Sequence, residues 1–249
     1  KGTIEADGGN VFLTARSANA LLDTVINTDG VIRANSIGNR NGTITLDGGN
    51  RGIVSVAGTL EAKGNDTGTT GGTVKVLGEY VGLLSGTNVN ASGDGGGGTV
   101  LVGGNFQGKG PEHNASAVWM GQGASINADA GSTGDGGKVI VWSENVSRVH
   151  GAISARGGSV SGNGGFVETS SHNQLEVGGL QLDLRAPNGQ GGEWLIDPLN
   201  VTIVAGGANT TVTAAPNFAP TASGAQIGVD NINTQLGLDG LGHFDREKQ

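Results

Sequence analysis

Two short motifs recur in register along most of the chain, at intervals of about 28 residues. The first motif, Gly-x-apolar-x-Ala, centres on one apolar residue in each repeat, and these residues are Ile4, Ile32, Leu60, Val89, Ile126, Ile153 and Leu184. The gaps between them are 28, 28, 29, 37, 27 and 31 residues. A period of this length indicates a repeat architecture, in which each unit buries its apolar face only by stacking on its neighbours.

The second motif, Gly-Gly-x-Val-x-Val or a close variant, follows the first in every repeat. Its copies are GGNVFL (8–13), NGTITL (41–46), GGTVKV (71–76), GGTVLV (97–102), GGKVIV (136–141), GGFVET (164–169) and GGEWLI (191–196). Most repeats carry a third apolar piece as well, such as IVSV (53–56). Side chains alternate along a strand, so the two apolar residues of each copy point to the same face, and we expect them to point inward. The inward pairs would be Val11/Leu13, Ile44/Leu46, Val74/Val76, Val100/Val102 and Val139/Val141. The sequence therefore predicts an all-β, right-handed parallel β-helix, a solenoid of about seven coils with three short strands in each.

Composition agrees with such a fold and excludes several classes of protein. The chain has 50 glycines but no glycine period of three and only five prolines, which excludes collagen. Its net charge is −8 and its 14 Lys and Arg are scattered, so we expect no nucleic-acid partner. No apolar run reaches the ~18 residues of a membrane span, so we expect no membrane insertion. Cysteine is absent, which rules out disulfides.

The repeats divide the chain into two regions. Residues 1–204 form the predicted β-helical shaft, and residues 205–249 form an irregular connection with a strand, a short helix and a frayed tail. The repeat from 97 to 135 is the longest, and its extra residues fall at 107–119. Insertions in a solenoid point outward, so we expect a lateral loop there. Trp194 takes an inward position and is expected to end the regular core.

The motif series GDGGKVIVWS (134–143), GAISARGG (151–158), GNGGFVETS (162–170) and the stretch from Trp194 to Pro198 resemble a known family. They are similar to filamentous-haemagglutinin-like exoproteins of two-partner secretion, more narrowly to the high-molecular-weight adhesins and the haem/haemopexin-utilisation exoproteins. The resemblance covers roughly residues 2–236. It implies a secreted β-helical rod that a dedicated outer-membrane transporter exports to the bacterial surface. The secretion domain's Asn-Pro-Asn-Leu motif is absent, so we expect the part of the shaft that follows this domain.

Two patterns that suggest ligand chemistry are explained better by the repeats. GDGGKVIVW (134–142) looks like a phosphate-binding loop, but Ser132 and Val139 stand where a P-loop needs glycine and a hydroxyl. Asp94, Asp129 and Asp135 could share a cation, but aspartates at turns also bond the turn backbone. We therefore predict no cofactor and no metal site.

Catalysis is the main rival to a structural role, because β-helices also carry polysaccharide lyases and hydrolases. Those reactions need clustered acids, or a base beside a second acid or Ca²⁺, on one face. The candidates here are Asp183, Arg185, Glu193 and Asp197, with a solvent-facing ion pair as the alternative for Asp183 and Arg185. We expect no enzyme. The four histidines, His113, His150, His172 and His243, are dispersed, and only His150 and His172 fall in neighbouring coils.

Modification and contact sites complete the candidates. Seven Asn-x-Ser/Thr sequons start at Asn41, Asn65, Asn90, Asn114, Asn145, Asn200 and Asn209. The resemblance makes them candidate glycosylation sites, while asparagine is also a common turn residue. Trp119, Trp142 and His113 form the candidate contact surface, and alternation should place Trp142 on the outside.

These observations predict a segment of a secreted cell-surface adhesin. It would be a non-catalytic shaft that supports attachment to host cells, matrix or other bacteria. Its partners would be the outer-membrane transporter during export and a glycan or protein receptor on a host or bacterial surface. The first alternative is a haem- or haemopexin-binding exoprotein, which would use a loop such as 107–119. The second is a β-helical polysaccharide lyase or hydrolase.

Overall fold

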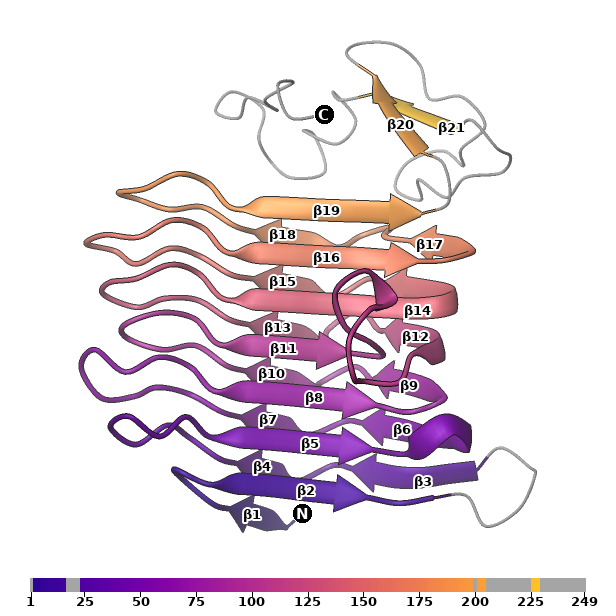
Figure 1. Ribbon diagram of the computed structural model, residues 1–249, viewed down its shortest axis with the longest axis horizontal. Helices are drawn as coiled ribbons and strands as arrows, with labels where there is room; N and C mark the ends of the chain where they lie inside the picture. The colour runs from indigo at the N-terminus through magenta and orange to yellow at the C-terminus, as the bar shows by residue number, and fades with distance from the viewer. Residues whose placement is uncertain (1, 17–22, 199–200, 205–224, 229–249) are drawn as a thin grey trace.

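The computed structural model describes residues 2–16, 23–198, 201–204 and 225–228. Parallel strands stack into a β-solenoid of about seven turns with about 28 residues per turn, which confirms the predicted fold class. The coils are seen side-on in Figure 1, from β1 and β2 at the N-terminal end to β19. The only helical elements in the described part are two 3₁₀ turns, η1 (Gly49–Arg51) and η2 (Phe106–Gly108).

Three faces make up each coil. Face 1 is a seven-stranded sheet of three-residue strands: β1 (Thr3–Glu5), β4 (Val31–Arg33), β7 (Thr59–Glu61), β10 (Asn88–Asn90), β13 (Ser125–Asn127), β15 (Ala152–Ser154) and β18 (Gln181–Asp183). Face 2 contains β2 (Asn10–Thr14), β5 (Thr43–Asp47), β8 (Thr73–Leu77), β11 (Thr99–Val102), the first half of β14 (Lys138–Val149), β16 (Phe166–Ser171) and β19 (Glu193–Pro198). Face 3 contains β3 (Asp23–Thr28), β6 (Gly52–Val56), β9 (Tyr80–Leu83), β12 (Ala115–Met120), the second half of β14 and β17 (Gln174–Glu176).

The inward positions match the sequence pattern. The predicted pairs from Ile44/Leu46 to Val139/Val141 are fully buried, and Val11 is 6% exposed. Neighbouring copies of each motif are aligned across the sheet, as Val100 is with Val139 and Val139 with Val167. Each coil thus covers the apolar side chains of the coil beside it, which is the stacking that a single repeat cannot supply.

The last copy of the first motif lies two residues from its predicted register. Ile153 pairs with Leu182, not with Leu184, so the final gap is 29 residues rather than 31. Leu182 and Leu184 have the same parity and both pack against the core cluster. A shift of two residues keeps the same side chains inside, so the hydrophobic pattern alone does not distinguish the two registers.

Trp194 lies where the sequence placed it, at the last described coil of the core. It is aligned with Val167 and packs against the core cluster. Its indole N–H donates a hydrogen bond of 3.0 Å to the Thr169 hydroxyl. The large ring thus covers the core while its polar atom is satisfied.

Glycine pairs mark the corner before face 2, where the chain passes close to the next coil. A Cβ atom on Gly137 would lie 2.1 Å from the carbonyl oxygen of Gly98, and one on Gly98 would lie 2.1 Å from that of Gly72. Backbone cannot yield at such a distance, so only glycine fits. In each of the later coils a long two-sided loop precedes this corner, and together these loops form a thin projection at the left of Figure 1. We call it the fin, made of residues 62–72, 91–98, 128–137, 155–165 and 184–192.

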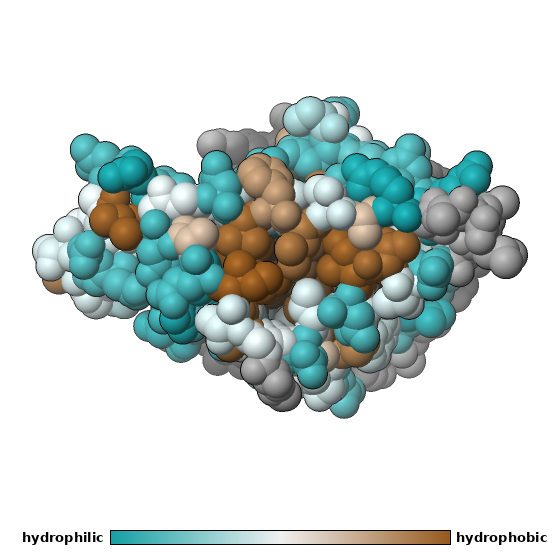
Figure 2. All heavy atoms as spheres, turned by 90° about the horizontal axis from the view of Figure 1, so that it is seen from below, coloured by the Kyte–Doolittle hydropathy of each residue, from teal (hydrophilic) through white to brown (hydrophobic). Residues whose placement is uncertain are grey.

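At the N-terminal end, the first coil leaves apolar side chains uncovered. Figure 2 shows apolar residues gathered in the middle of this end face. Ile4 of β1 is 43% exposed, although its counterpart Ile32 one coil further on is 3% exposed. At the other end, β20 (Val201–Val204) pairs in parallel with β21 (Ala225–Gly228). The remainder of the predicted 205–249 region, with its short helix and tail, lies outside the described residues, so the division at 204 stays a prediction.

Candidate functional site

A lateral loop leaves the regular solenoid between β11 and β12 and covers part of the outer surface of face 2. It comprises residues 103–114 and crosses in front of β11 and β14 in Figure 1. The excursion was expected at 107–119. In the structure it begins earlier, directly after β11, and it ends at 114, because residues 115–119 belong to strand β12. Ala117 and Val118 hydrogen-bond into the sheet as partners of β9 and β14, so that part of the segment is regular coil.

Beneath this loop lies a second, smaller apolar cluster, separate from the core. It consists of the outward side chains Leu101, Ile140 and Trp142, with Phe106 and Phe166 packed against them. Trp142 points away from the core, as alternation predicts, but it is only 6% exposed. The prediction that Trp142 offers a contact surface is therefore wrong. Alternation identifies the side of the sheet and gives no information on what packs over it.

Polar contacts fix the lateral loop at several points. Glu112 accepts hydrogen bonds from the Lys75 ammonium at 2.6 Å and the Asn105 amide at 2.7 Å. Burial by itself raises the pKa of Glu112, but these hydrogen bonds outweigh it and hold the pKa below its ordinary value. Further along, the backbone N–H of Gln107 donates to the fully buried carboxylate of Glu168.

His113 and Asn114 end the loop, and both are largely covered. His113 Nε2 is buried without a hydrogen bond and lies 3.7 Å from a carboxylate oxygen of Asp47. The Asn114 side-chain amide donates to the Gly108 carbonyl and to Glu144. These side chains hold the loop in place, and the role of His113 in a contact surface remains a prediction.

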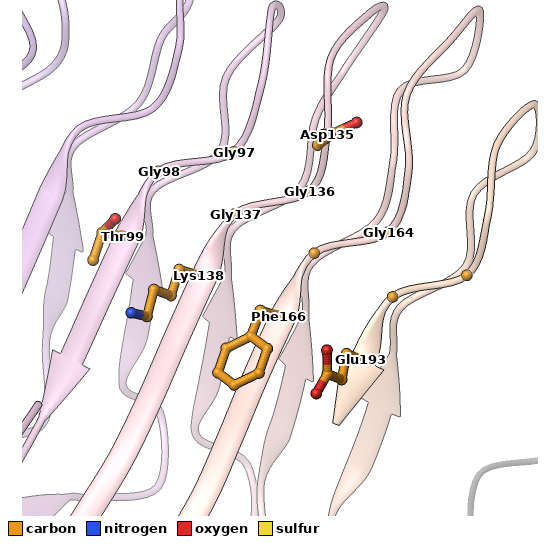
Figure 3. Close-up of a pocket in the computed structure, with 13 residues that line it drawn as sticks. Gly97, Gly98, Thr99, Asp135, Gly136, Gly137, Lys138, Gly164, Phe166 and Glu193 are labelled. Atoms are coloured by element: carbon orange, nitrogen blue, oxygen red, sulfur yellow. The ribbon is translucent and has the colours of Figure 1, made fainter. Parts of the chain in front are cut away.

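Next to the loop, an open groove of about 510 Å³ runs along the corner between the fin and face 2. It crosses four coils, and Figure 3 shows its wall side chains: Thr99, Lys138, Phe166 and Glu193 occupy one matching position in successive strands, and Asp135 lies on the fin side. Glycine pairs form the floor between them. The Lys138 ammonium lies 5.0 Å from the ring centre of Phe106 and 6.0 Å from that of Phe166. The lateral loop thus supports one wall of the groove.

The acids proposed for catalysis do not gather in this groove. Asp183 forms a two-point ion pair with Arg185 on the face 1 side, and this pairing lowers the Asp183 pKa. Glu193 lines the groove, whereas nothing is described for the side chain of Asp197. Asp135 and Glu193 are separated by two strand spacings and three residues, roughly 14 Å from strand geometry. Asp135 uses its carboxylate to accept a hydrogen bond from the Asn163 N–H, so it serves the turn backbone.

The corner aspartates bond the backbone of neighbouring coils. Asp94 accepts a hydrogen bond from Ser132, which is the main cause of its lowered pKa, and one from the Gly68 N–H. Asp129 accepts from the N–H of Arg156 and Asp135 from that of Asn163. In the described part of the chain, no group of three or more His, Cys, Asp or Glu could hold a metal ion.

The histidines in neighbouring coils have separate partners. His150 Nδ1 lies 2.6 Å from the Gly178 carbonyl oxygen, and its Nε2 lies 3.5 Å from Glu176. His172 pairs with Glu144 at 3.1 Å. His243 lies outside the described residues, as do the sequons at Asn200 and Asn209.

The other sequons differ in how accessible their asparagines are. Asn41, Asn65 and Asn145 are exposed, and Asn90 and Asn114 are half-buried. Asn114 uses its amide nitrogen in two hydrogen bonds, so it is the least available acceptor of a sugar. Glycosylation at these sites stays a prediction.

Trp119 is the exposed member of the predicted contact surface. It lies on the outer side of β12 on face 3 and is 42% exposed, and Tyr80 on the adjacent strand β9 is 37% exposed. The sequence analysis did not identify Tyr80. It could have done so, because Tyr80 alternates with the inward residues Val81 and Leu83 and must therefore point outward. Within the residues that the structure describes, no lateral loop covers this pair.

Together, these features define a parallel β-solenoid that carries a lateral loop and an axial groove. No protein-family model matches the chain, and no curated protein sequence matches it. Among solved structures, the chain is similar to the HMW1 secretion domain from Haemophilus influenzae, with 28% sequence identity and a TM-score of 0.62. The match covers 78% of this chain and 48% of the solved chain, so the chain spans about half the length of that domain. Within the described residues, no helix is long and apolar enough to cross a membrane.

Proposed function

We propose that this chain is a segment of a secreted exoprotein of the two-partner-secretion type, exported through an outer-membrane transporter to the bacterial surface. The observation that carries the proposal is the similarity to the HMW1 secretion domain in both sequence and fold. The sequence motifs led us to expect the shaft that follows a secretion domain, while the similar structure is itself a secretion domain. Both assignments support the proposal that the segment belongs to this kind of exported protein.

In this protein the segment would serve as a non-catalytic shaft that supports attachment to host cells, matrix or other bacteria. A stack of coils with a continuous apolar core makes a stiff, extended element that needs no disulfide, and cysteine is absent. The absence of disulfides suits a chain that crosses an outer membrane unfolded. No contact in the described residues favours haemopexin binding through the lateral loop, because that loop is packed onto face 2.

The export part is tested in the native bacterium with the full-length protein. Deleting the gene of the outer-membrane transporter should move the protein from the surface and medium to the periplasm, as detected by immunoblotting of fractions. An unchanged distribution would refute two-partner export. The attachment part is tested by counting bacteria bound to cultured epithelial cells, with a strain that lacks the protein as the comparison. Equal counts would refute a role in attachment.

A further inference from the structure

The floor of the axial groove carries a row of backbone carbonyl groups, one in each coil that the groove crosses, that have no hydrogen-bond partner among the described residues. In successive coils, the second glycine of each pair donates its N–H across the base of the fin to a residue of the same coil. These bonds join Gly98 to Ala91, Gly137 to Ala128, Gly165 to Ala155 and Gly192 to Leu184. A trans peptide directs its carbonyl opposite to its N–H, so the carbonyl of the first glycine points out of the fin base toward the groove.

Four of these first glycines, Gly97, Gly136, Gly164 and Gly191, line the groove. Among the described residues, none of their carbonyl oxygens accepts a hydrogen bond. The coils are one strand spacing apart, so the four acceptors repeat every ~4.8 Å along the solenoid axis. These carbonyls line an open groove and have no partner in the described part of the chain, so a regular row of acceptors is available to the donor groups of a ligand.

The walls of the groove add three kinds of contact. Phe166 offers part of its ring, and its edge-to-face packing on Phe106, with ring centres 5.7 Å apart, fixes its orientation. Asp135 and Glu193 are exposed carboxylates that accept hydrogen bonds. Among the described residues that line the groove, Lys138 is the only cation, and it lies against the two rings.

We propose that this groove binds a neutral, hydroxyl-rich glycan chain that lies along the axis of the solenoid. Sugar hydroxyls donate to the row of carbonyls and to the two carboxylates, while the apolar face of a sugar ring packs on Phe166. The rise per sugar of an extended glycan is comparable to the spacing of the coils. Alternate sugars, which turn the same edge to the groove, therefore meet equivalent acceptors two coils apart. An extended peptide fits less well, because its N–H groups on one side repeat every second residue, at ~6.8 Å.

Charge decides between neutral and acidic glycans. Two carboxylates face one ammonium in the groove, and the whole chain has a net charge of −8. An acidic polysaccharide would bring further negative charge to this surface and would be repelled. The inference goes beyond the proposed function, in which the segment only supports attachment, because here the segment holds a ligand itself.

The test uses the purified chain and isothermal titration calorimetry with cellohexaose and xylohexaose as neutral probes and a hyaluronan hexasaccharide as the acidic probe. We expect a neutral probe to bind, and to bind as well in EDTA as in buffer. Binding of the acidic probe alone, or of neither class, would overturn the proposal. So would loss of binding in EDTA, since a metal ion would then occupy the carbonyls.

A matched pair of variants locates the site. Gly191 lines the groove, and a Cβ atom added there meets no atom within 4 Å, so Gly191→Leu fills the groove without strain. We expect it to weaken binding at least about tenfold, which corresponds to ~1.4 kcal/mol. Gly2→Leu is the control, because Gly2 has the same open surroundings and lies at the opposite end of the solenoid. Equal affinity of the Gly191→Leu variant and the wild type would contradict the assignment.

A second variant tests the carboxylate wall. Glu193→Gln keeps the shape of the side chain but removes its charge, so affinity should fall several-fold as charge-assisted hydrogen bonds become neutral ones. Glycan binding by the purified wild-type chain and export of the full-length protein with and without the transporter are measured side by side, which separates the two proposals. Normal export without glycan binding by the wild type would refute the groove alone, and glycan binding with transporter-independent export would refute the proposed function alone.

Discussion

Trp119 and Trp142 both point away from the core, from neighbouring strands of the same solenoid, yet only one of them meets solvent. Trp119 on face 3 is 42% exposed, and Trp142 on face 2 is 6% exposed. The difference lies in the lateral loop, whose Gly108 lies directly over the Trp142 ring. The same repeat thus gives one bare outer face and one covered outer face, and the covered face has a small core of its own.

The two rings also differ in what surrounds them. Trp142 is enclosed by Leu101, Ile140 and the loop, so nearly all of its area is removed from water. Trp119 lies beside backbone: Gly82 is its partner in β9, and a Cβ on Gly121 would come within 2.7 Å of the ring. Burial of apolar area stabilises in proportion to the area, so the covered ring should contribute far more to folding.

Trp142→Ala should show the largest effect. Removing a buried tryptophan leaves a cavity that the loop and the sheet fill only partly, and we expect a loss of about 3 kcal/mol in the free energy of unfolding. Chemical denaturation followed by circular dichroism measures it. A denaturation midpoint equal to that of the wild type would show that the loop does not pack on face 2.

Gly108→Ala should have the next largest effect, because it displaces the lateral loop from face 2 but keeps the Trp142 side chain. Gly108 has φ = +66°, and a Cβ there would lie 2.4 Å from a ring atom of Trp142. The left-handed conformation and the clash together should cost about 2 kcal/mol. The emission of Trp142 should shift to longer wavelength as the loop lifts. Trp119→Ala as a background simplifies the measurement by removing the exposed emitter.

The contrast between the faces also explains how far sequence reasoning could reach. Periodicity predicts the fold class, the inward pairs such as Val139/Val141 and the inward position of Trp194. It can do so because equivalent positions are buried in successive repeats. The lateral loop occurs in only one repeat, so the other repeats give no information on the course of its backbone. Its contacts with Trp142 also join residues that are far apart in sequence. The position of an insertion was readable, but the surface that it covers was not.

The axial groove was hidden for a different reason. Read singly, GDGGKVIVW suggested a phosphate loop, and read as a repeat it suggested only a corner. The groove comes from the stacking of four such corners, whose glycines expose carbonyls at the same place in each coil. Lys138, the lysine of this stretch, lies near two phenylalanine rings, and one of them belongs to the lateral loop.

Acid should loosen the covered face more than the bare one. The pKa of Glu112 is lowered in the folded protein, so the stability it contributes is present above its ordinary pKa of 4.5 and is lost as the pH falls through the lowered folded value. We expect Trp142 emission to shift below about pH 4.5 before the coils unfold. Glu112→Gln should weaken this anchor at neutral pH by about 1 kcal/mol and remove the part of the pH dependence that Glu112 supplies.

Trp119→Ala should have the smallest effect on stability, less than about 0.5 kcal/mol, because an exposed ring on a flat sheet loses little contact when it is removed. Its denaturation midpoint should equal that of the wild type, while acrylamide should quench much less of the remaining tryptophan emission. A destabilisation as large as that of Trp142→Ala would mean that face 3 is covered too, and the difference between the two faces would disappear. An unchanged midpoint would leave Trp119 and Tyr80 as an aromatic pair whose exposure the fold does not need, which is the property expected of a contact surface.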